Sequence, residues 1–104
     1  MMVQNYFDKI FCINLDKRVD RWNHFEKQSN KFNISEYERI SAVDGDTIDV
    51  SQYPSKFMKG EIGLLLTSIN VFEKAIELNL ENFLIFEDDC LINENILELD
   101  SYFS

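Results

Sequence analysis

Four bulky apolar residues followed by three acids form the stretch Phe83-Leu84-Ile85-Phe86-Glu87-Asp88-Asp89. An apolar run of this kind is typical of a strand that is buried on both faces, as in a parallel sheet packed between helices. Ligands bind to open α/β sheets at the carboxyl ends of the strands, which is where these carboxylates are expected. Clustered carboxylates at such a place can hold Mg²⁺ or Mn²⁺ against phosphate groups. The stretch therefore predicts an α/β fold with a ligand site at the end of this strand.

The rest of the chain supplies the other elements of such a fold. β-Branched and aromatic residues predict strands at Lys9–Leu15 and Glu38–Val43. Apolar residues at helical spacing predict helices at Val19–Asn30 and Ile62–Leu78. The elements then alternate as in a Rossmann-like half-sheet with flanking helices. Thr47–Lys59 contains the single proline and is weakly patterned, so a surface loop with a short helix is expected there.

Caps and helix faces can also be predicted. Asp16 or Asp20 is placed to cap the start of the first helix, and Asn79 is placed to cap the end of the second. The apolar segments after Asp89 predict a last strand or a short amphipathic helix; they are Leu91-Ile92, Ile96-Leu97-Leu99 and Tyr102-Phe103. The side of the second helix that faces the core is expected to consist of Leu65, Leu66, Ile69, Phe72, Ala75 and Ile76.

Length and charge limit the classes of protein to which the chain can belong. The 104 residues leave room for one domain, residues 1–104, and the 45% hydrophobic content suffices for a core. The net charge is −9, and residues 75–104 contain eight acids and no Lys or Arg. No basic stripe is available for a polyanion, so no nucleic-acid partner is expected.

The cysteines and the N-terminal sequence predict the cellular compartment. Cys12 and Cys90 each lie in or beside an apolar run, which favours reduced core cysteines over a disulfide or a metal site. The sequence has neither a signal-peptide pattern nor an apolar stretch of about 20 residues. We therefore expect a cytoplasmic protein without a transmembrane segment.

Three polar residues at the end of the first strand are candidates for nucleotide contacts: Asn14, Arg18 and Arg21. The planar guanidinium of Arg binds phosphate oxygens in a bidentate manner, and a helix start adds unpaired N–H groups. Alternatively, the two arginines form ion pairs on a solvated helix face with Asp16, Asp20 or Glu26.

Two further groups complete the candidate site. Asp44-Gly45 follows the second strand, where nucleotide-binding sheets set an acid against ribose hydroxyls, although the dipeptide is also common in turns. Strand alternation lets Glu87 and Asp89 point together while Asp88 points away, so Glu87 and Asp89 are the metal candidates. The alternative is a strand end that frays into solvent. No Ser/His/Asp, Cys/His or zinc-spaced arrangement is present.

Four blocks, taken in order, resemble glycosyltransferase family 25, which includes the lipooligosaccharide and procollagen galactosyltransferases. The blocks are Ile13–Trp22, Arg39–Gly45, Gly60–Gly63 and Leu84–Asp89. The resemblance implies a partial GT-A fold, truncated after the acidic motif, that binds a UDP-sugar with Mn²⁺ or Mg²⁺. It further implies transfer of a hexose, galactose or glucose, to a hydroxyl of a glycan, lipooligosaccharide or hydroxylysine acceptor.

The same resemblance assigns the candidate residues. It implies a metal held by Glu87 and Asp89, and a nucleotide sugar bound by Asn14, Arg18, Arg21, Asp44, Gly45 and Glu87. The divalent ion would stabilise the departing diphosphate as a Lewis acid, and a base would act on the acceptor hydroxyl.

The chain departs from the family in two ways. It has Leu66-Thr67-Ser68 where family members usually have Leu-Ser-His, and the family's catalytic domain continues well past the acidic motif. The catalytic base is therefore unknown, and the chain is expected to be the N-terminal nucleotide-sugar-binding part. An alternative is a non-catalytic module that pairs with a fuller homologue or a partner subunit. An open sheet edge would invite self-association or a partner chain.

Overall fold

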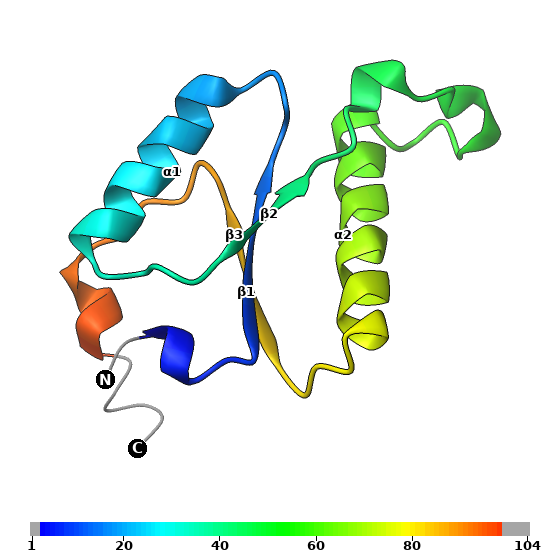
Figure 1. The fold of residues 1–104 in the computed structure, drawn as a ribbon. Coiled ribbons are helices and arrows are strands. Elements are labelled where there is room, and N and C mark those ends of the chain that lie inside the picture. The colour runs from blue at the N-terminus through cyan, green and yellow to red at the C-terminus, as the bar shows by residue number, and fades with distance from the viewer. Residues whose placement is uncertain (1–2, 99–104) are drawn as a thin grey trace.

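A computed structural model describes residues 3–98 and contains one three-stranded parallel sheet (Figure 1). The strands are β1 (Lys9–Asn14), β2 (Glu38–Ser41) and β3 (Phe83–Glu87). They lie in the order β2-β1-β3, with Phe11 of β1 opposite Glu38 of β2 and Ile85 of β3. The predicted α/β class and all three predicted strands are confirmed.

Two helices cover opposite faces of this sheet, α1 (Val19–Lys31) and α2 (Lys59–Glu77) (Figure 1). The strand order explains this arrangement. The connection from β1 to β2 runs in one direction along the sheet, and the connection from β2 to β3 runs in the opposite direction. Right-handed crossovers therefore place their helices on different faces. Short 3₁₀ helices complete the described chain: Val3–Asn5, Gly45–Thr47, Val50–Gln52 and Glu94–Glu98.

The core is centred on β1, because both faces of this strand are covered. Phe11 and Cys12 are completely buried, and Ile10 is nearly so. Alternating side chains of β1 contribute to two hydrophobic clusters, which are Val3, Ile10 and Ile34 on one face, and Phe11, Ile13 and Val71 on the other. Burial, and next the charge of Asp88, raises the pKa of the Cys12 thiol to about 12. The predicted reduced state agrees with this, since Cys12 and Cys90 are both free thiols.

Both helices end in the same way. Asn33 and Asn79 adopt left-handed backbone conformations with φ of 59° and 56°. The N–H of the next residue then bonds back to the helix, from Ile34 to Ser29 O at 2.8 Å and from Leu80 to Ala75 O at 3.0 Å. Asn79 thus ends α2 as predicted.

The predicted cap of α1 is wrong. Arg18 occupies the N-cap position and makes no side-chain capping bond. The carboxylate of Asp20 is bound by the Arg18 side chain, and the carboxylate of Asp16 is bound by Arg39 and Ser41. Both carboxylates are thus bound by other side chains, and neither acid occupies the N-cap position.

The predicted buried side of α2 is also largely wrong. Ile62, Val71 and Ala75 face the core, but four of the predicted residues are between 42% and 79% exposed: Leu65, Ile69, Phe72 and Ile76. The described sheet has only three strands, so it covers one side of the helix and leaves the other uncovered. For the same reason β3 is an edge strand whose apolar residues are half-buried, and not buried on both faces.

The segment after β3 packs beside α1. Gln28 accepts a hydrogen bond from the Ile92 N–H at 2.6 Å and donates one to the carbonyl of Cys90 at 2.8 Å. The predicted short helix is present at Glu94–Glu98, while Leu99, Tyr102 and Phe103 lie outside the described residues. Within residues 3–98, no helix has the length and apolar character needed to cross a membrane.

Gly63 provides a test of the contact between α2 and the segment after β2. A Cβ at Gly63 would lie 2.8 Å from the Val43 carbonyl oxygen, whereas a Cβ at Gly60 would meet nothing within 4 Å. We expect Gly63→Ala to lower the free energy of unfolding by about 1–3 kcal/mol, because backbone cannot move away as a side chain can. In the matched control Gly60→Ala, higher helix propensity should leave stability equal or increase it by up to about 1 kcal/mol. Equal urea midpoints for the two variants would contradict this packing.

Glu38 provides a test of the electrostatic links between elements. Its carboxylate on β2 pairs with Lys74 of α2, and with Lys9 of β1 at 3.3 Å, and these ammonium groups lower its pKa. A lowered carboxyl pKa stabilises the folded state above the unfolded pKa, and this contribution is lost as the pH falls through the folded pKa. We expect Glu38→Gln to cost about 0.2–1 kcal/mol at pH 7 and almost nothing at pH 3, since the pair is partly exposed.

Thermal unfolding of Glu38→Gln at pH 7, 4 and 3 would measure this effect. Glu36→Gln removes the same charge at an exposed position nearby and serves as the control. A deficit of Glu38→Gln that did not shrink with falling pH would show that the ion pairs are not its cause.

Candidate functional site

A cavity of about 440 Å³ opens at the carboxyl ends of the strands. In the order β2-β1-β3 the connection from β1 runs to β2 in one direction, and the connection from β2 runs back past β1 to β3 in the other, which makes this end the topological switch point of the sheet. All three strand ends and the start of α2 contribute to the walls. The lining residues that carry charge are Lys17, Arg21, Asp44, Asp46, Lys59 and Glu87.

Asn14, the last residue of β1, lies beneath this cavity and joins the three strand ends. It is only 2% exposed. Its Nδ2 donates to Asp88 Oδ2 at 2.6 Å and to the Arg18 carbonyl at 3.1 Å, while its Oδ1 accepts from Arg39 Nε at 3.0 Å. Asn14 is not among the residues that line the cavity, and its predicted contact with a nucleotide stays a prediction.

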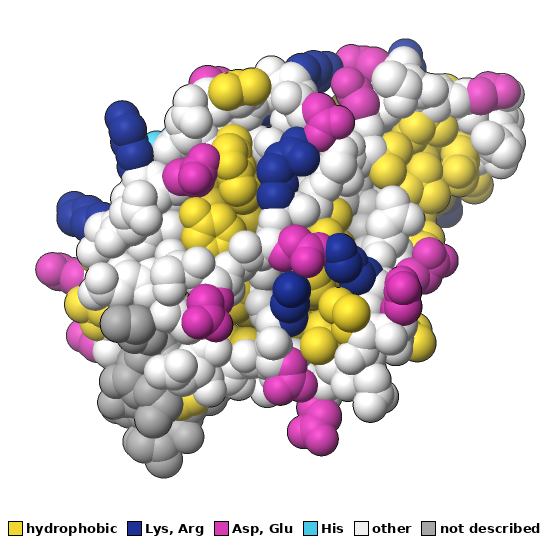
Figure 2. Space-filling model, viewed as in Figure 1, with side chains coloured by type: hydrophobic (Ala, Val, Ile, Leu, Met, Phe, Trp, Pro, Cys, Tyr) yellow, Lys and Arg dark blue, Asp and Glu magenta, His cyan; other side chains and the backbone are white. Residues whose placement is uncertain are grey.

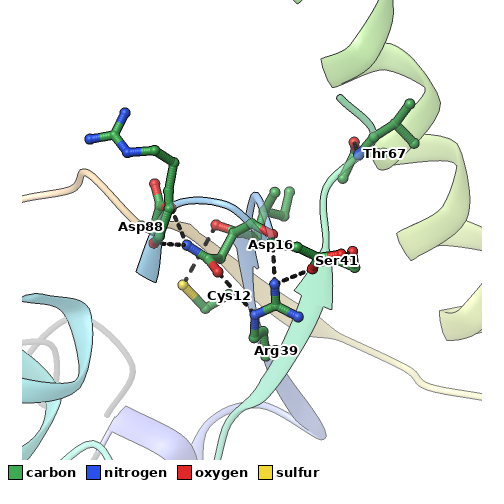
Figure 3. A network of polar contacts seen from close by, with 10 residues as sticks. Cys12, Asp16, Arg39, Ser41, Thr67 and Asp88 are labelled. Carbon is green, nitrogen blue, oxygen red and sulfur yellow. Dashed lines mark hydrogen bonds and ion pairs between the residues drawn. The ribbon is translucent and has the colours of Figure 1, made fainter. Parts of the chain in front are cut away.

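Arg39 extends this polar network across the end of β2. Figure 3 shows Arg39 and Ser41 reaching Asp16 from β2, and Asp88 on the far side of the network. The Arg39 guanidinium also lies over the Trp22 ring, 5.9 Å from its centroid. Arg39 and Ser41 together lower the pKa of Asp16, so this carboxylate stays charged beside the guanidinium.

Asp44 and Gly45 line the cavity, as predicted for a site at the end of β2. The Asp44 carboxylate accepts a hydrogen bond from the Asp46 N–H at 3.0 Å and pairs with Lys17 Nζ at 3.0 Å. Lys17, and next the Asp46 N–H, lowers the pKa of Asp44, while Asp44 raises the pKa of Lys17. The cavity therefore has a cation and an anion side by side at its rim.

Gly45 and Thr67 fix the segment after β2 against α2. A Cβ at Gly45 would lie 2.3 Å from the Lys59 carbonyl oxygen, so only glycine permits this approach. Thr67 is 1% exposed, and its hydroxyl accepts from the Val43 N–H at 2.9 Å while donating to the Gly63 carbonyl at 2.7 Å. The start of α2 is thus held at one wall of the cavity.

The three acids after β3 have different surroundings. Asp88 is 7% exposed and bonded to Asn14, whereas Glu87 and Asp89 are exposed. Glu87 lines the cavity, and Asp89 does not. Among the described residues, no group of three or more Asp, Glu, His or Cys is arranged to hold a metal ion. The assignment of Glu87 and Asp89 as a metal pair stays a prediction.

The two arginines predicted at the start of α1 are separated by the fold. Arg18 forms a two-pronged ion pair with Asp20 at 3.0 and 2.9 Å, outside the residues that line the cavity. Arg21 lines the cavity, with its NH1 3.8 Å from Asp88 Oδ1. Arg18 therefore forms a surface ion pair, which was the alternative interpretation, whereas Arg21 lies at the cavity.

Three residues of this region were not singled out from the sequence: Lys17, Arg39 and Lys59. The first two lie inside the sequence blocks at the ends of β1 and β2, so their position in the chain was the available signal. Lys59 carries no such signal, because only the packing of α2 brings it to the cavity. Thr67 drew notice only as a departure from the family, and its contact with Val43 could not be predicted from that.

The sequence model described as "Glycosyltransferase family 25 (LPS biosynthesis protein)" matches residues 7–103. The chain belongs to glycosyltransferase family 25. Among curated relatives, procollagen galactosyltransferase 2 of Mus musculus is 33% identical over 99 residues, covering 80% of this chain and 16% of that protein. Procollagen galactosyltransferase 1-A of Xenopus laevis is 29% identical with the same coverage. A relative in Haemophilus influenzae is 30% identical over 109 residues, covering 95% of this chain and 38% of that protein.

These family 25 relatives are longer than the chain described here. It spans less than two-fifths of each of the three, and about one-sixth of the procollagen galactosyltransferases. No solved structure matches the sequence.

Thr67 provides a test of how the cavity wall is held. Thr67→Val preserves the shape of the side chain but removes the acceptor for the partly buried Val43 N–H. We expect a loss of about 0.5–1.5 kcal/mol in the free energy of unfolding, the net contribution of a typical intramolecular hydrogen bond. Thr67→Ser keeps the hydroxyl and should lose less. Urea unfolding of both variants would check this, and a valine variant as stable as the serine variant would refute the role of the hydroxyl.

Proposed function

We propose that this chain forms the nucleotide-sugar-binding part of a family 25 glycosyltransferase and that its cavity takes the UDP moiety of a UDP-sugar. The observation that carries the proposal is the location and charge of the cavity. It lies at the topological switch point, and cations and anions both line it. Membership of family 25 supports the reaction class.

The cations of the cavity suit a diphosphate. Lys17, Arg21 and Lys59 come from three different segments and line the same space. Arg binds phosphate oxygens with a planar fork and Lys binds them as a point charge. Asp44 lies at the end of β2, the place where related sheets bind ribose hydroxyls, and we assign it this contact.

A divalent ion, Mn²⁺ or Mg²⁺, fits the site only together with the diphosphate. The described residues do not assemble a protein-only ligand set, and ions of this kind are commonly bound by one or two carboxylates plus substrate phosphates. Of the three acids after β3, Glu87 lines the cavity, and exposed Asp89 is its proposed partner. When bound, the ion would neutralise charge on the departing diphosphate.

The remaining assignments follow from the family alone. We propose a hexose, galactose or glucose, as the transferred group and a glycan, lipooligosaccharide or hydroxylysine hydroxyl as the acceptor. Procollagen galactosyltransferases among the relatives favour a galactose donor. We assign no catalytic base to a residue of this chain.

The second candidate function is a non-catalytic module that pairs with a fuller homologue or partner subunit. Two observations favour it, the uncovered apolar side of α2 and the edge strand β3. Phe72 of α2 contacts Phe83 of β3 with ring centroids 5.8 Å apart, so these two surfaces are continuous. Figure 2 shows further apolar side chains at the surface, in a patch beside the start of α2.

UDP binding tests the proposed function. We expect UDP with Mn²⁺ to stabilise the folded chain by about 2–3 kcal/mol at a ligand concentration 100 times Kd, and chelation of the metal to reduce the effect. Arg21→Ala should remove most of the stabilisation, because its guanidinium lines the cavity, whereas Arg18→Ala should keep it. Thermal unfolding with and without UDP, MnCl₂ and EDTA measures these effects.

Two results would contradict this function. One is a melting temperature unaffected by millimolar UDP in the presence of Mn²⁺. The other is an equal response of Arg21→Ala and Arg18→Ala. Metal-independent assembly in size-exclusion chromatography, together with no response to UDP, would instead favour the interaction module.

A further inference from the structure

Asp88 is the middle residue of the acidic motif Glu87-Asp88-Asp89, and it is the acid whose side chain the fold holds in place. The Asp88 N–H donates to the Ile13 carbonyl at 3.2 Å, which extends the pairing of β3 with β1 by one residue. Its carboxylate Oδ2 accepts from Asn14 Nδ2 at 2.6 Å. The chain just beyond is held on α1 by Gln28. Main chain and side chain of Asp88 are therefore both anchored, while Glu87 and Asp89 are exposed.

The bond from Asn14 to Asp88 has a defined direction. Arg39 Nε can only donate and the Arg18 carbonyl can only accept, so Oδ1 of Asn14 must face Arg39 and Nδ2 must face Arg18. The second hydrogen of Nδ2 then points to Asp88. Arg39 is itself held by Asp16 and by the face of Trp22. A chain of contacts thus leads from Trp22 on α1 through Arg39 and Asn14 to one oxygen of Asp88.

The other oxygen of Asp88 faces a cation at the cavity. Asp88 Oδ1 lies 3.8 Å from Arg21 NH1, and the Arg21 side chain is 41% exposed and lines the cavity. A guanidinium carries five N–H donors, and one ion pair occupies few of them. The carboxylate can therefore hold one side of the guanidinium while the remaining donors meet an anion.

We propose that Asp88 is a positioning residue that sets the Arg21 guanidinium for a ligand phosphate, and that Arg39 acts on Arg21 through Asn14 and Asp88. The inference rests on the proposed function, in which the cavity takes a nucleoside diphosphate. It divides the acidic motif by role, with Asp88 directed to Arg21 and the two exposed acids left for a metal ion.

The first test measures the order of Arg21 without any ligand. In ¹⁵N relaxation experiments, the order parameter of the Arg21 Nε–H should fall in Asp88→Asn, which removes the charge but can still accept from Asn14. Asp20→Asn makes the same charge change beside Arg21 and should leave the order parameter unchanged, because Asp20 pairs with Arg18. An Arg21 signal that is equally ordered in wild type and Asp88→Asn would overturn the proposal.

The second test measures UDP affinity by calorimetry in a double-mutant cycle. Asp88→Asn should weaken UDP binding about tenfold, by the same factor in Mn²⁺ and in EDTA, and should have no further effect in an Arg21→Ala background. Arg39→Lys keeps the charge but loses the bond to Asn14, and should weaken binding in the same way though less. Arg39 does not line the cavity, so its effect must be transmitted.

The outcomes separate the two proposals. Loss of the Mn²⁺ dependence in Asp88→Asn would make Asp88 a metal ligand and overturn the positioning role. A tenfold loss that persisted in Arg21→Ala would also overturn it. Failure of the wild-type chain to bind UDP would refute the proposed function, whereas the Arg21 order parameter would still decide whether Asp88 positions this side chain. If Asp88→Asn does not fold, Arg39→Lys supplies both measurements.

Discussion

The carboxamide of Asn14 is the interaction on which the ligand end of the sheet depends. A parallel sheet brings three strand ends to one edge, but its backbone ladder stops there and does not fix the loops that follow. Asn14 makes the missing connections, because one side chain bonds to Asp88 after β3, to Arg39 of β2 and to the loop that starts α1. A buried amide of this kind must keep all its partners, since any unpaired polar group there would be costly.

The strands and helices could be predicted from the sequence wherever the burial of an element determines its spacing of apolar residues. The apolar run Phe83–Phe86 predicts strand β3, which the structure has at Phe83–Glu87, although the predicted burial of this strand on both faces is wrong. The face of α2 could not be predicted in the same way. Helical spacing identifies an apolar side, but the side that packs depends on the width of the sheet, and a sheet of three strands buries Val71 while exposing Ile69 and Phe72.

The candidate site could be predicted only by region. Acids and arginines at strand ends indicate one edge of the sheet, and Arg21, Asp44, Gly45 and Glu87 line a cavity there. The role of each residue depends on contacts between distant parts of the chain, such as Asn14 with Asp88, 74 residues apart. No local pattern separates Arg18, which pairs with its neighbour Asp20, from Arg21, which faces the cavity.

The order of the strands has a consequence for biosynthesis. The central strand β1 leaves the ribosome before both of its neighbours, and β3 follows only near the end of the described chain. Until Phe83–Glu87 has been translated, one edge of β1 is unpaired, and Phe11 and Ile13 lack the part of their cover that Phe83 and Ile85 supply. Incomplete chains that expose an unpaired apolar strand edge are prone to aggregate, so the interval before β3 is made is the vulnerable one for this fold.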